Sequence, residues 1–305
     1  MPLYAYFRDQ FVPLSEARIG VMTHALHYGT ALFEGIRGNW NSEHQQIYLF
    51  RLREHYERLG RGCRVLNINL PYTVDRLSQI TVELVAKSGL KEDMYIRPLA
   101  YKGSESLGVR LHDLEDNFLV FAIPWGRYLD VDKARCIVSS WRRPDDNVIP
   151  PQVKIAGTYV NNALAKTEAF EGGFDEAIML APDGHVSEGT GENIFLVING
   201  RLVTPASYNN ILVGITRNTI IELARNELGI ETIERQVDRS ELYTADECFL
   251  AGTAAHITPV AEIDYRKIGD GEIGEVTRNL QGIYTEVIRG NNPKYLGWCT
   301  PVYKK

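Results

Sequence analysis

Apolar residues recur with helical spacing in two segments of the first part of the chain. Around "REHYERLGRGCRVL", residues 53–66, one helical face collects Leu52, Tyr56, Leu59 and Cys63. In "YTVDRLSQITVELVAKSGL", residues 72–90, a second face collects Val74, Leu77, Thr81, Leu84 and Val85. Gly89 is placed to end that second helix. Apolar runs in the same part of the chain predict strands at 47–52, 94–103 and 117–125.

The second part of the chain is predicted to open with a strand at 135–141. A helix is predicted from about Tyr159 to Glu171, and Gly172 and Gly173 are expected to end it. Its helical stripe, at i, i+3, i+4 and i+7, consists of Val160, Ala163, Leu164 and Thr167.

Tight turns follow, at "PDG" between the runs 174–180 and 192–198 and at "NG" before the run 201–206. Both turns use dipeptides that hairpins favour. A further helix is predicted at 216–229, with Thr216 as its cap and Gly229 as its stop. This mixture of hairpins and helices predicts an α+β fold rather than a doubly wound parallel sheet.

The chain has 305 residues, which exceeds most single cores and suggests two domains. We expect a smaller N-terminal domain at 1–120, an interdomain loop at 121–134 and a larger C-terminal domain at 135–305. The net charge of −6 and the pI of about 5.7 leave no basic field for a nucleic-acid backbone. We interpret short basic groups such as "SWRRP" as solvated faces.

The N-terminal stretch lacks a long apolar core, so we expect no secretory leader. The sequence contains no run of ~18 apolar residues, so we expect no membrane span. His24 and His27 have no acidic or cysteine partner nearby, and we expect packing or hydrogen bonding there rather than a metal site. The scattered cysteines form no C-x-x-C pair, which predicts free buried thiols in a reducing cytoplasm; they are Cys63, Cys136, Cys248 and Cys299.

Four short stretches combine an amine, an acid and two anion-binding turns. Lys154 lies among apolar neighbours in "VKIAG", and Glu188 lies between small residues after a strand. Residues 214–216 open a helix with unpaired N–H groups, and 252–254 form a turn of small residues. Each stretch alone has an ordinary structural explanation as a strand end, a turn carboxylate, a capped helix or a loop. Together they make up the set that an enzyme using pyridoxal 5′-phosphate requires.

Motifs along nearly the whole chain resemble the fold-type IV pyridoxal-phosphate aminotransferases, and specifically the branched-chain amino acid aminotransferases. The motifs are "VMTHALHYGTALFEGIRG", "EHYERL", "YIRPLAY", "VKIAGTYVNNALAKTEA", "VSEGTGENIFLV", "VGITRNTIIELA" and "GTAAHITPV". The resemblance implies a two-domain α+β architecture whose larger domain carries the cofactor lysine. It also implies transamination of leucine, isoleucine and valine with 2-oxoglutarate.

The resemblance assigns roles to individual positions. Lys154 matches the lysine that binds the cofactor covalently and moves protons in catalysis. Glu188 matches the acid that keeps the ring nitrogen protonated, Tyr159 the tyrosine that bonds the ring's phenolic oxygen, and Arg58 the arginine that binds the phosphate. The remaining cofactor contacts that it implies are Leu212, Gly214, Ile215, Thr216 and Thr253.

The expected substrate pocket must accept an apolar side chain and, in the next half-reaction, a carboxylate. We expect the α-carboxylate at the Thr253–Ala254 turn and the Tyr95 hydroxyl, and the distal carboxylate of glutamate at Arg97. The alternative for Arg97 is a structural arginine bonded to strand carbonyls. Apolar surface is expected from Tyr28, Phe33, Val109, Trp125 and Tyr159.

In the family that the chain resembles, a loop from a neighbouring subunit completes the site, and "ESLGV" at 105–109 occupies that position. We therefore expect at least a homodimer, with a hexamer as the larger alternative.

A D-amino acid or (R)-amine transaminase and an aminodeoxychorismate lyase are alternative functions on the same fold. "YIR" at 95–97 and "SLGV" at 106–109 favour the branched-chain pattern. A cofactor-free binding protein is the alternative from a different class.

Overall fold

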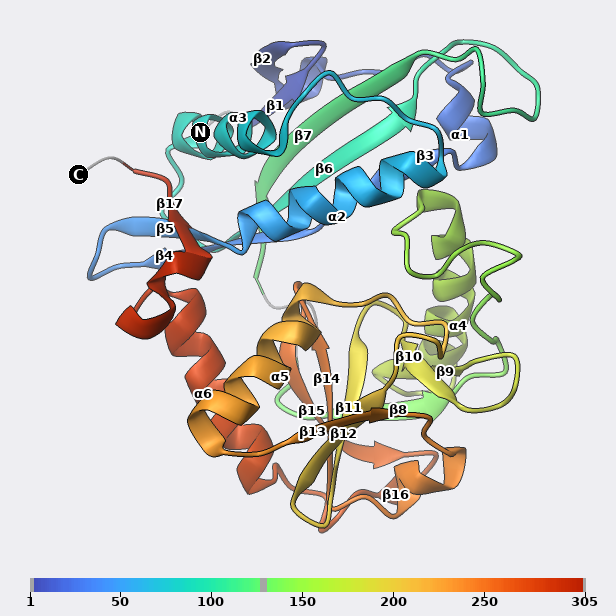
Figure 1. Cartoon of the computed structure of the whole chain (residues 1–305), viewed down its shortest axis with the longest axis vertical. Coiled ribbons are helices and arrows are strands. Elements are labelled where there is room, and N and C mark those ends of the chain that lie inside the picture. The colour runs from blue at the N-terminus through green and yellow to red at the C-terminus, as the bar shows by residue number, and fades with distance from the viewer. Residues whose placement is uncertain (1–2, 127–130, 304–305) are drawn as a thin grey trace. The chain divides into compact units, whose positions relative to one another are not determined.

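The computed structural model describes residues 3–126 and 131–303, which form two compact units (Figure 1). The first unit comprises Met1–Gly126, Val153–Gly157 and Glu286–Lys305, and the second comprises Arg127–Gln152 and Thr158–Thr285. No helix among the described residues is long and apolar enough to cross a membrane.

This division differs from the predicted boundaries. Residues 153–157, including the candidate lysine, belong to the first unit because Ile155 bridges to Leu32 there. Residues 286–305 also return to the first unit, where Cys299 pairs with Phe50. Of the predicted loop at 121–134, residues 121–124 continue a strand of the first unit and 127–130 lie outside the described residues.

The first unit is built on an antiparallel sheet of eight strands. In sheet order the strands are β17 (Cys299–Pro301), β5 (Gln46–Phe50), β4 (Ile36–Asn41), β6 (Met94–Lys102), β7 (Asp116–Pro124), β1 (Tyr4–Phe7) and β2 (Gln10–Pro13), and β3 (Ala31–Phe33) pairs with β6. The predicted strands at 47–52, 94–103 and 117–125 correspond to β5, β6 and β7.

Helices α2 (Leu52–Val65) and α3 (Val74–Ser88) pack on this sheet and on each other, and a short helix, α1 (His24–Tyr28), precedes β3 (Figure 1). The apolar face predicted for α2 is buried. Gly89 ends α3 in the left-handed conformation, with φ of 62°, as its position predicted. His24 is buried and its two ring nitrogens contact the Thr30 hydroxyl and the Gly108 carbonyl, which confirms a hydrogen-bonding role.

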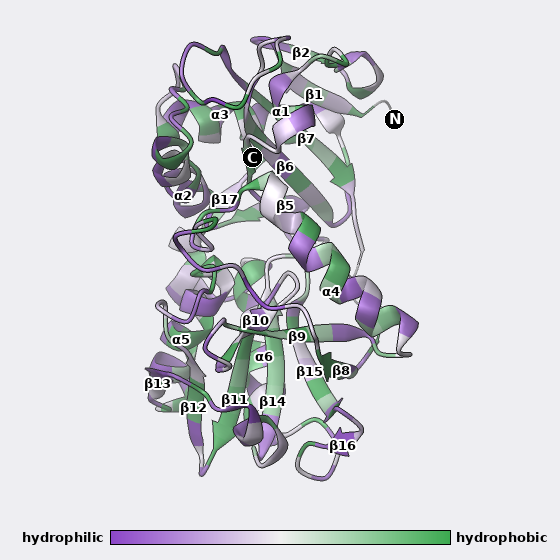
Figure 2. Cartoon of the chain, turned by 90° about the vertical axis from the view of Figure 1, so that its right-hand side faces the viewer, coloured by the Kyte–Doolittle hydropathy of each residue, from purple (hydrophilic) through white to green (hydrophobic). Residues whose placement is uncertain are grey.

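The second unit contains a nine-stranded mixed sheet. In sheet order the strands are β10 (Val186–Gly189), β9 (Glu176–Leu180), β8 (Ala134–Val138), β15 (His256–Ile263), β14 (Glu247–Gly252), β11 (Asn193–Ile198), β12 (Arg201–Pro205) and β13 (Thr232–Arg235), with β16 (Arg266–Lys267) beside β15. The core of this unit is apolar, and the paired strands β11 and β14 both contribute residues to it. Both strands are coloured mainly hydrophobic in Figure 2. The turn at "PDG" leads into β10, which pairs with β9. The apolar pattern did not predict a separate strand at this place.

Helix α5 (Ile215–Leu228) begins one residue earlier than predicted. Gly214 is the N-cap and Gly229 is the left-handed C-cap. The prediction of Thr216 as the cap is wrong, because Thr216 already lies in the first turn and its hydroxyl is 3.5 Å from that of Tyr284. Helix α6 (Glu275–Ile288) carries Tyr284, and the division between the two units falls near its end.

Helix α4 (Tyr159–Glu171) has the predicted bounds but buries a different face. Asn162, Ala165 and Ala169 face the sheet, whereas Val160 and Leu164 of the predicted stripe are 65% and 40% exposed. The small alanines let α4 lie close to β9, and Asn162 accepts a hydrogen bond from the buried Arg143. Packing therefore selected a face that apolar periodicity did not predict.

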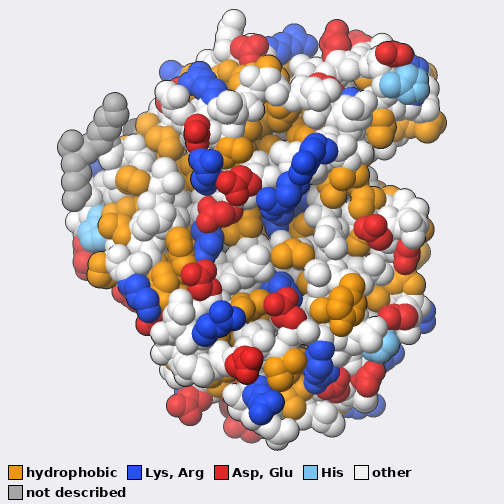
Figure 3. Space-filling model, viewed as in Figure 1, with side chains coloured by type: hydrophobic (Ala, Val, Ile, Leu, Met, Phe, Trp, Pro, Cys, Tyr) orange, Lys and Arg blue, Asp and Glu red, His pale blue; other side chains and the backbone are white. Residues whose placement is uncertain are grey.

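All four cysteines are free and buried, as the sequence predicted. Acidic and basic side chains alternate over the surface seen in Figure 3, in keeping with the mixed, mildly acidic composition. Among residues 3–126 and 131–303, no group of three or more histidine, cysteine or acidic side chains could hold a metal ion.

Candidate active site

The candidate residues are divided equally between the two units. The first unit contains Tyr28, Phe33, Arg58, Tyr95, Arg97, Val109, Trp125 and Lys154. The second contains Tyr159, Glu188, Leu212, Gly214, Ile215, Thr216, Thr253 and Ala254.

Lys154 is held by a short backbone pairing with β3. The Phe33 amide donates to the Lys154 carbonyl at 3.1 Å, next to the bridge between Leu32 and Ile155. Gly157 donates to the Gly29 carbonyl at 3.3 Å, and a Cβ on Gly29 would lie 2.7 Å from the Gly157 Cα. Ile155, one of the apolar neighbours that made Lys154 conspicuous in the sequence, therefore takes part in this pairing.

The Phe33 ring brings Lys154 and Arg97 together. The Lys154 Nζ lies 5.0 Å from the centre of the ring, and the Arg97 guanidinium carbon lies 4.3 Å from it. Both distances are within the range of a cation–π contact. Two cations on one aromatic ring make a local environment suited to an anionic or carbonyl ligand.

Tyr95 and Arg97 point to the same side of β6, because they are two residues apart on a strand. Arg97 Nη2 donates to the Tyr95 hydroxyl at 3.0 Å, and the Tyr95 ring packs on Trp125 with centres 5.3 Å apart. Arg97 Nε is buried and has no hydrogen-bond partner among the described residues. A buried donor without an acceptor is costly in a folded protein, and it is a natural position for a ligand oxygen.

Gly35 makes room for this arrangement. A Cβ at Gly35 would lie 2.2 Å from the Tyr95 hydroxyl oxygen and 2.9 Å from its ring carbon, which is closer than atoms can pack. The glycine of "FEG" therefore permits the hydroxyl to lie against the backbone.

Tyr28 and Val109 belong to a more exposed part of the first unit. The Gly108 amide donates to the Tyr28 hydroxyl at 3.0 Å, which fixes the loop next to Val109. Val109 itself is 91% exposed. Arg58 lies on α2 and forms a two-pronged ion pair with Glu34, the residue after Phe33.

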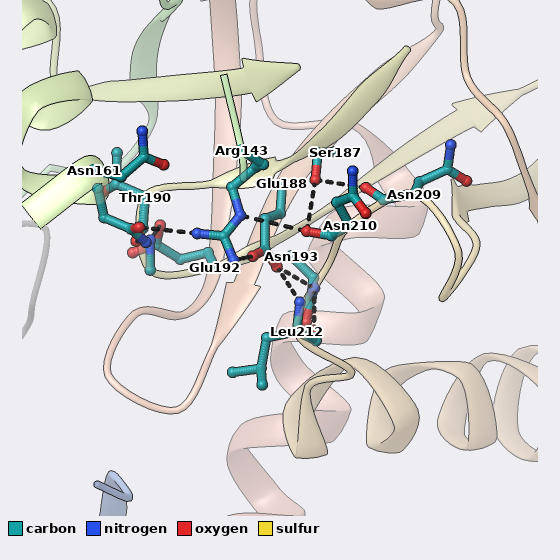
Figure 4. A network of polar contacts seen from close by, with 12 residues as sticks. Arg143, Asn161, Ser187, Glu188, Thr190, Glu192, Asn193, Asn209, Asn210 and Leu212 are labelled. Atoms are coloured by element: carbon teal, nitrogen blue, oxygen red, sulfur yellow. Dashed lines mark hydrogen bonds and ion pairs between the residues drawn. The ribbon is translucent and has the colours of Figure 1, made fainter. Parts of the chain in front are cut away.

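Glu188 is the centre of a buried polar network in the second unit (Figure 4). Its Oε1 lies 3.0 Å from Arg143 Nη2. Its Oε2 accepts hydrogen bonds from the Leu212 amide and from Asn193 Nδ2, both at 3.0 Å. These donors stabilise the ionised carboxylate at a position where burial alone would favour the neutral acid.

Arg143 and Asn193 are functional candidates that sequence reasoning missed. Arg143 belongs to "SWRRP", and its interpretation as part of a solvated face is wrong, because its side chain is 4% exposed and its Nη1 donates to Asn162 Oδ1 at 2.9 Å. Asn193 donates to the Leu212 carbonyl at 2.8 Å as well as to Glu188. The only sequence signal for Asn193 was its place in "EGTGENIF".

The α5 start provides a set of backbone donors. No side chain caps the helix at Gly214, so the first N–H groups, those of Ile215 and Thr216, have no intrahelical acceptor. A Cβ on Gly214 would lie 2.2 Å from Asn193 Oδ1, so the glycine allows the helix start to lie directly against the Glu188 network. Partial positive charge at a helix N-terminus favours an anion there.

The Thr253–Ala254 turn follows β14, the strand that pairs with β11. Asn193 lies opposite Ala251 in that pairing, which brings the turn near the network around Glu188. Tyr159 begins α4, one turn before Asn162, and is linked to the same network through that helix.

Glu192 is a second buried carboxyl in the same motif. It is 4% exposed, its Oε2 accepts from the Gly191 amide at 3.0 Å, and it packs against Gly252. Burial, helped by the negative charge of Glu176, raises the pKa of Glu192 from 4.5 to about 8. Two neighbouring carboxyls thus differ: Glu188 has cationic and amide donors, whereas Glu192 favours the neutral acid.

Comparison with known proteins shows the class of protein to which this fold belongs. The family model Amino-transferase class IV matches residues 31–263, so the chain belongs to the class IV aminotransferases. Among its relatives, it is 52% identical over 303 residues to the probable branched-chain-amino-acid aminotransferase of Aquifex aeolicus (strain VF5), covering 99% of this chain and 97% of that protein.

Solved structures of branched-chain aminotransferases share the fold. The enzyme from Thermoproteus uzoniensis with norvaline is 43% identical, with a TM-score of 0.95 and coverage of 99% of this chain and 100% of that one. The Thermobaculum terrenum enzyme in its PLP-form is 39% identical, with a TM-score of 0.95 and coverage of 99% of both chains. The predicted α+β, fold-type IV architecture is confirmed.

Proposed function

We propose that this chain transfers the amino group of branched-chain L-amino acids to 2-oxoglutarate, giving branched-chain 2-oxo acids and L-glutamate, with pyridoxal 5′-phosphate as cofactor. Support comes from relatives named as branched-chain aminotransferases along nearly the whole chain. The observation that carries the proposal is the shared Phe33 ring, on which the reactive amine of Lys154 and the guanidinium of Arg97 both lie.

The residues present fit such a cofactor. A phosphate monoester needs several donors, and the uncapped start of α5 offers the amides of Ile215 and Thr216. A protonated ring nitrogen needs an anionic partner, and the three donors around Glu188 favour its ionised form. We assign the phosphate also to Arg58 and Thr253.

The other cofactor contacts are proposed from the same resemblance. We assign Tyr159 to the phenolic oxygen of the ring and Leu212 to its face. Gly214 is assigned a steric role, because a side chain there would collide with Asn193 and displace the helix start from the Glu188 network.

Pyridoxal phosphate supplies, when bound, a carbonyl that condenses with amines and a ring that accepts the electron pair left when the α-proton departs. Lys154 would hold the cofactor through its Nζ. The same Nζ, as a free amine, would accept the α-proton of the substrate and act as the proton donor when the proton is returned. Arg143, Asn193 and the Leu212 amide contact the carboxylate of Glu188 and favour its ionised form, which would stabilise positive charge on the ring nitrogen.

Recognition of two substrate types is assigned to polar and apolar residues of the candidate set. We assign the α-carboxylate to the Tyr95 hydroxyl and the Thr253–Ala254 amides. Arg97 is assigned to the distal carboxylate of glutamate, since its Nε is a buried donor without an acceptor among the described residues. The apolar surface for leucine is assigned to Phe33, Trp125 and the remaining pocket residues, Tyr28, Val109 and Tyr159.

A substrate panel tests this function. The purified chain, loaded with pyridoxal phosphate, is given L- and D-forms of leucine, isoleucine and valine, together with (R)-amines, and 2-oxo acid formation is measured with 2-oxoglutarate as acceptor. We expect turnover of the L-amino acids to exceed that of the other series. Preference for the D-amino acids or (R)-amines would contradict the proposal in favour of the related transaminases, and a colourless protein that binds no cofactor would contradict it altogether.

We also propose that the chain acts as at least a homodimer, in which the loop at 105–109 contributes to the site of a neighbouring copy. Leu107 and Val109 are 54% and 91% exposed in the single chain, and such apolar exposure is typical of a surface with a partner. Analytical ultracentrifugation is expected to give a dimer or a hexamer, and Val109→Asp is expected to lower activity more than Val148→Asp, a control at a valine that is 72% exposed elsewhere. A fully active monomer at assay concentration would contradict this assembly.

A cytoplasmic location is proposed because the four buried cysteines are free thiols, which need no oxidising compartment.

A further inference from the structure

Glu34 is buried beside the proposed phosphate ligand Arg58. The Glu34 side chain is 1% exposed, and its two oxygens are fully engaged. Oε1 accepts from Arg58 Nε at 2.7 Å, and Oε2 accepts from Arg58 Nη2 at 2.8 Å and from His55 Nδ1 at 2.7 Å.

This geometry fixes the guanidinium plane of Arg58. A carboxylate that bonds both Nε and Nη2 holds the fork in one orientation and directs Nη1 away from itself. His55 and Arg58 are three residues apart on α2, so they lie on one helical face, and Glu34 faces both from the end of β3. The three side chains connect α2 to the strand that bears Phe33.

The charges of the three groups are also defined. Burial works to raise the pKa of Glu34, but Arg58 and His55 together bring it well below its ordinary value, so the carboxylate is ionised. Burial lowers the pKa of His55, which favours its neutral form. An ionised carboxylate only accepts hydrogen bonds, so the proton of neutral His55 must be on Nδ1.

The negative charge of Glu34 thus offsets the positive charge of Arg58 within this pair. Glu34 weakens the attraction of Arg58 for a dianion and, in exchange, holds it in a single orientation. A long arginine side chain loses much conformational freedom when it is fixed, and prior fixing removes that loss from the binding step.

We propose that Glu34 and His55 are positioning residues for phosphate recognition: Glu34 orients Arg58, and His55 orients Glu34. The proposal rests on the proposed function, in which Arg58 binds the cofactor's phosphate. It assigns an effect to two residues that need not touch the cofactor themselves.

The test compares binding of pyridoxal 5′-phosphate with binding of pyridoxal, which lacks the phosphate, to the cofactor-free full-length chain. The preference for the phosphate, expressed as the dissociation constant of pyridoxal divided by that of pyridoxal phosphate, reports on phosphate recognition alone, whereas general damage to the site weakens both ligands. Arg58→Met sets the value of this ratio without the arginine. Glu34→Gln keeps the shape but loses the charge and places an amide against the guanidinium, and we expect it to lower the ratio at least 10-fold. Glu57→Gln, on the exposed side of α2 where Glu57 pairs with Arg53 at 3.0 Å, is the matched control and should leave the ratio unchanged.

A second pair of variants keeps the test decisive if Glu34→Gln folds poorly. His55→Asn keeps a donor near the position of Nδ1, whereas His55→Leu removes it. We expect His55→Leu to lower the ratio several-fold and His55→Asn to restore it. In the Arg58→Met background, His55→Leu should change the ratio no further, because its effect passes through Arg58.

The outcomes separate the two levels of the argument. An unchanged or increased ratio in Glu34→Gln would overturn the positioning role, and so would equal ratios in His55→Leu and His55→Asn. Arg58 would still stand as the phosphate ligand in either case, provided that Arg58→Met lowers the ratio. A wild-type chain that binds pyridoxal as tightly as pyridoxal phosphate would instead show that the proposed phosphate site is wrong.

Discussion

Replacing Arg97 by methionine should separate the two substrate classes of this enzyme. The variant Arg97→Met keeps an unbranched apolar stem over the Phe33 ring and removes the guanidinium that lies 4.3 Å from its centre. Leucine, which makes no charged contact through its side chain, should lose little. Glutamate and 2-oxoglutarate should lose the partner that we assign to their distal carboxylate.

The magnitude follows from the contacts of Arg97. Its bond to the Tyr95 hydroxyl, 3.0 Å long, is lost for every substrate and is worth ~1 kcal/mol, or about 5-fold. Loss of one partner of a desolvated charged pair costs ~2–5 kcal/mol, or roughly 30- to 5,000-fold, and this applies to the dicarboxylic substrates alone. The rate ratio between leucine and glutamate should therefore rise by at least about 30-fold.

Stopped-flow absorbance of the cofactor measures each half-reaction separately, so leucine and glutamate can be compared in single turnovers. Tyr95→Phe is the control, because it removes the hydroxyl that receives the Arg97 bond and should slow both amino acids to a similar extent. Equal losses for leucine and glutamate in Arg97→Met would refute the reasoning and leave Arg97 as a structural support of Tyr95.

Two further changes address the second unit. Arg143→Met should lower the free energy of unfolding by ~3 kcal/mol, because it leaves the buried carboxylate of Glu188 without its cationic partner. Arg142→Met, at the exposed neighbour, should change the free energy of unfolding by less than ~0.5 kcal/mol. Chemical denaturation measures both variants, and equal effects would argue against a buried pair. For Glu192 the pKa is raised in the folded chain, so between its ordinary 4.5 and about 8 the unfolded chain releases a proton that the folded chain retains. Wild-type stability should consequently fall by up to ~1.4 kcal/mol per pH unit over that window relative to Glu192→Gln, and parallel pH profiles of the two proteins would contradict the raised pKa.

Local patterns predicted the elements of this chain well where burial and periodicity coincide. The apolar face of α2 and the glycine stop of α3 could be predicted because each is determined within about four turns of sequence. The face of α4 could not, since Asn162 is buried to meet Arg143, and that partner lies 19 residues earlier in the chain. A polar residue that is buried for the sake of a distant partner leaves no periodic signal.

The candidate site shows the same limit. Lys154 and Glu188 stood out because each is a charged residue among apolar or small neighbours. Glu34 and Arg143 did not, because their importance comes from partners 24 and 45 positions away, Arg58 and Glu188 respectively. Spacing along one helix or strand cannot report such pairs, which exist only once the sheet and its helices have formed.

Lys154 is the residue that we propose is joined to pyridoxal phosphate. Borohydride reduction of the loaded wild-type chain, followed by peptide mapping with mass spectrometry, tests this proposal directly. We expect a phosphopyridoxyl group on the Nζ of Lys154. In Lys154→Ala we expect neither this group nor the visible absorbance of the bound cofactor. Modification of a different lysine, or a Lys154→Ala variant with wild-type visible absorbance, would show that Lys154 is not the residue that binds the cofactor.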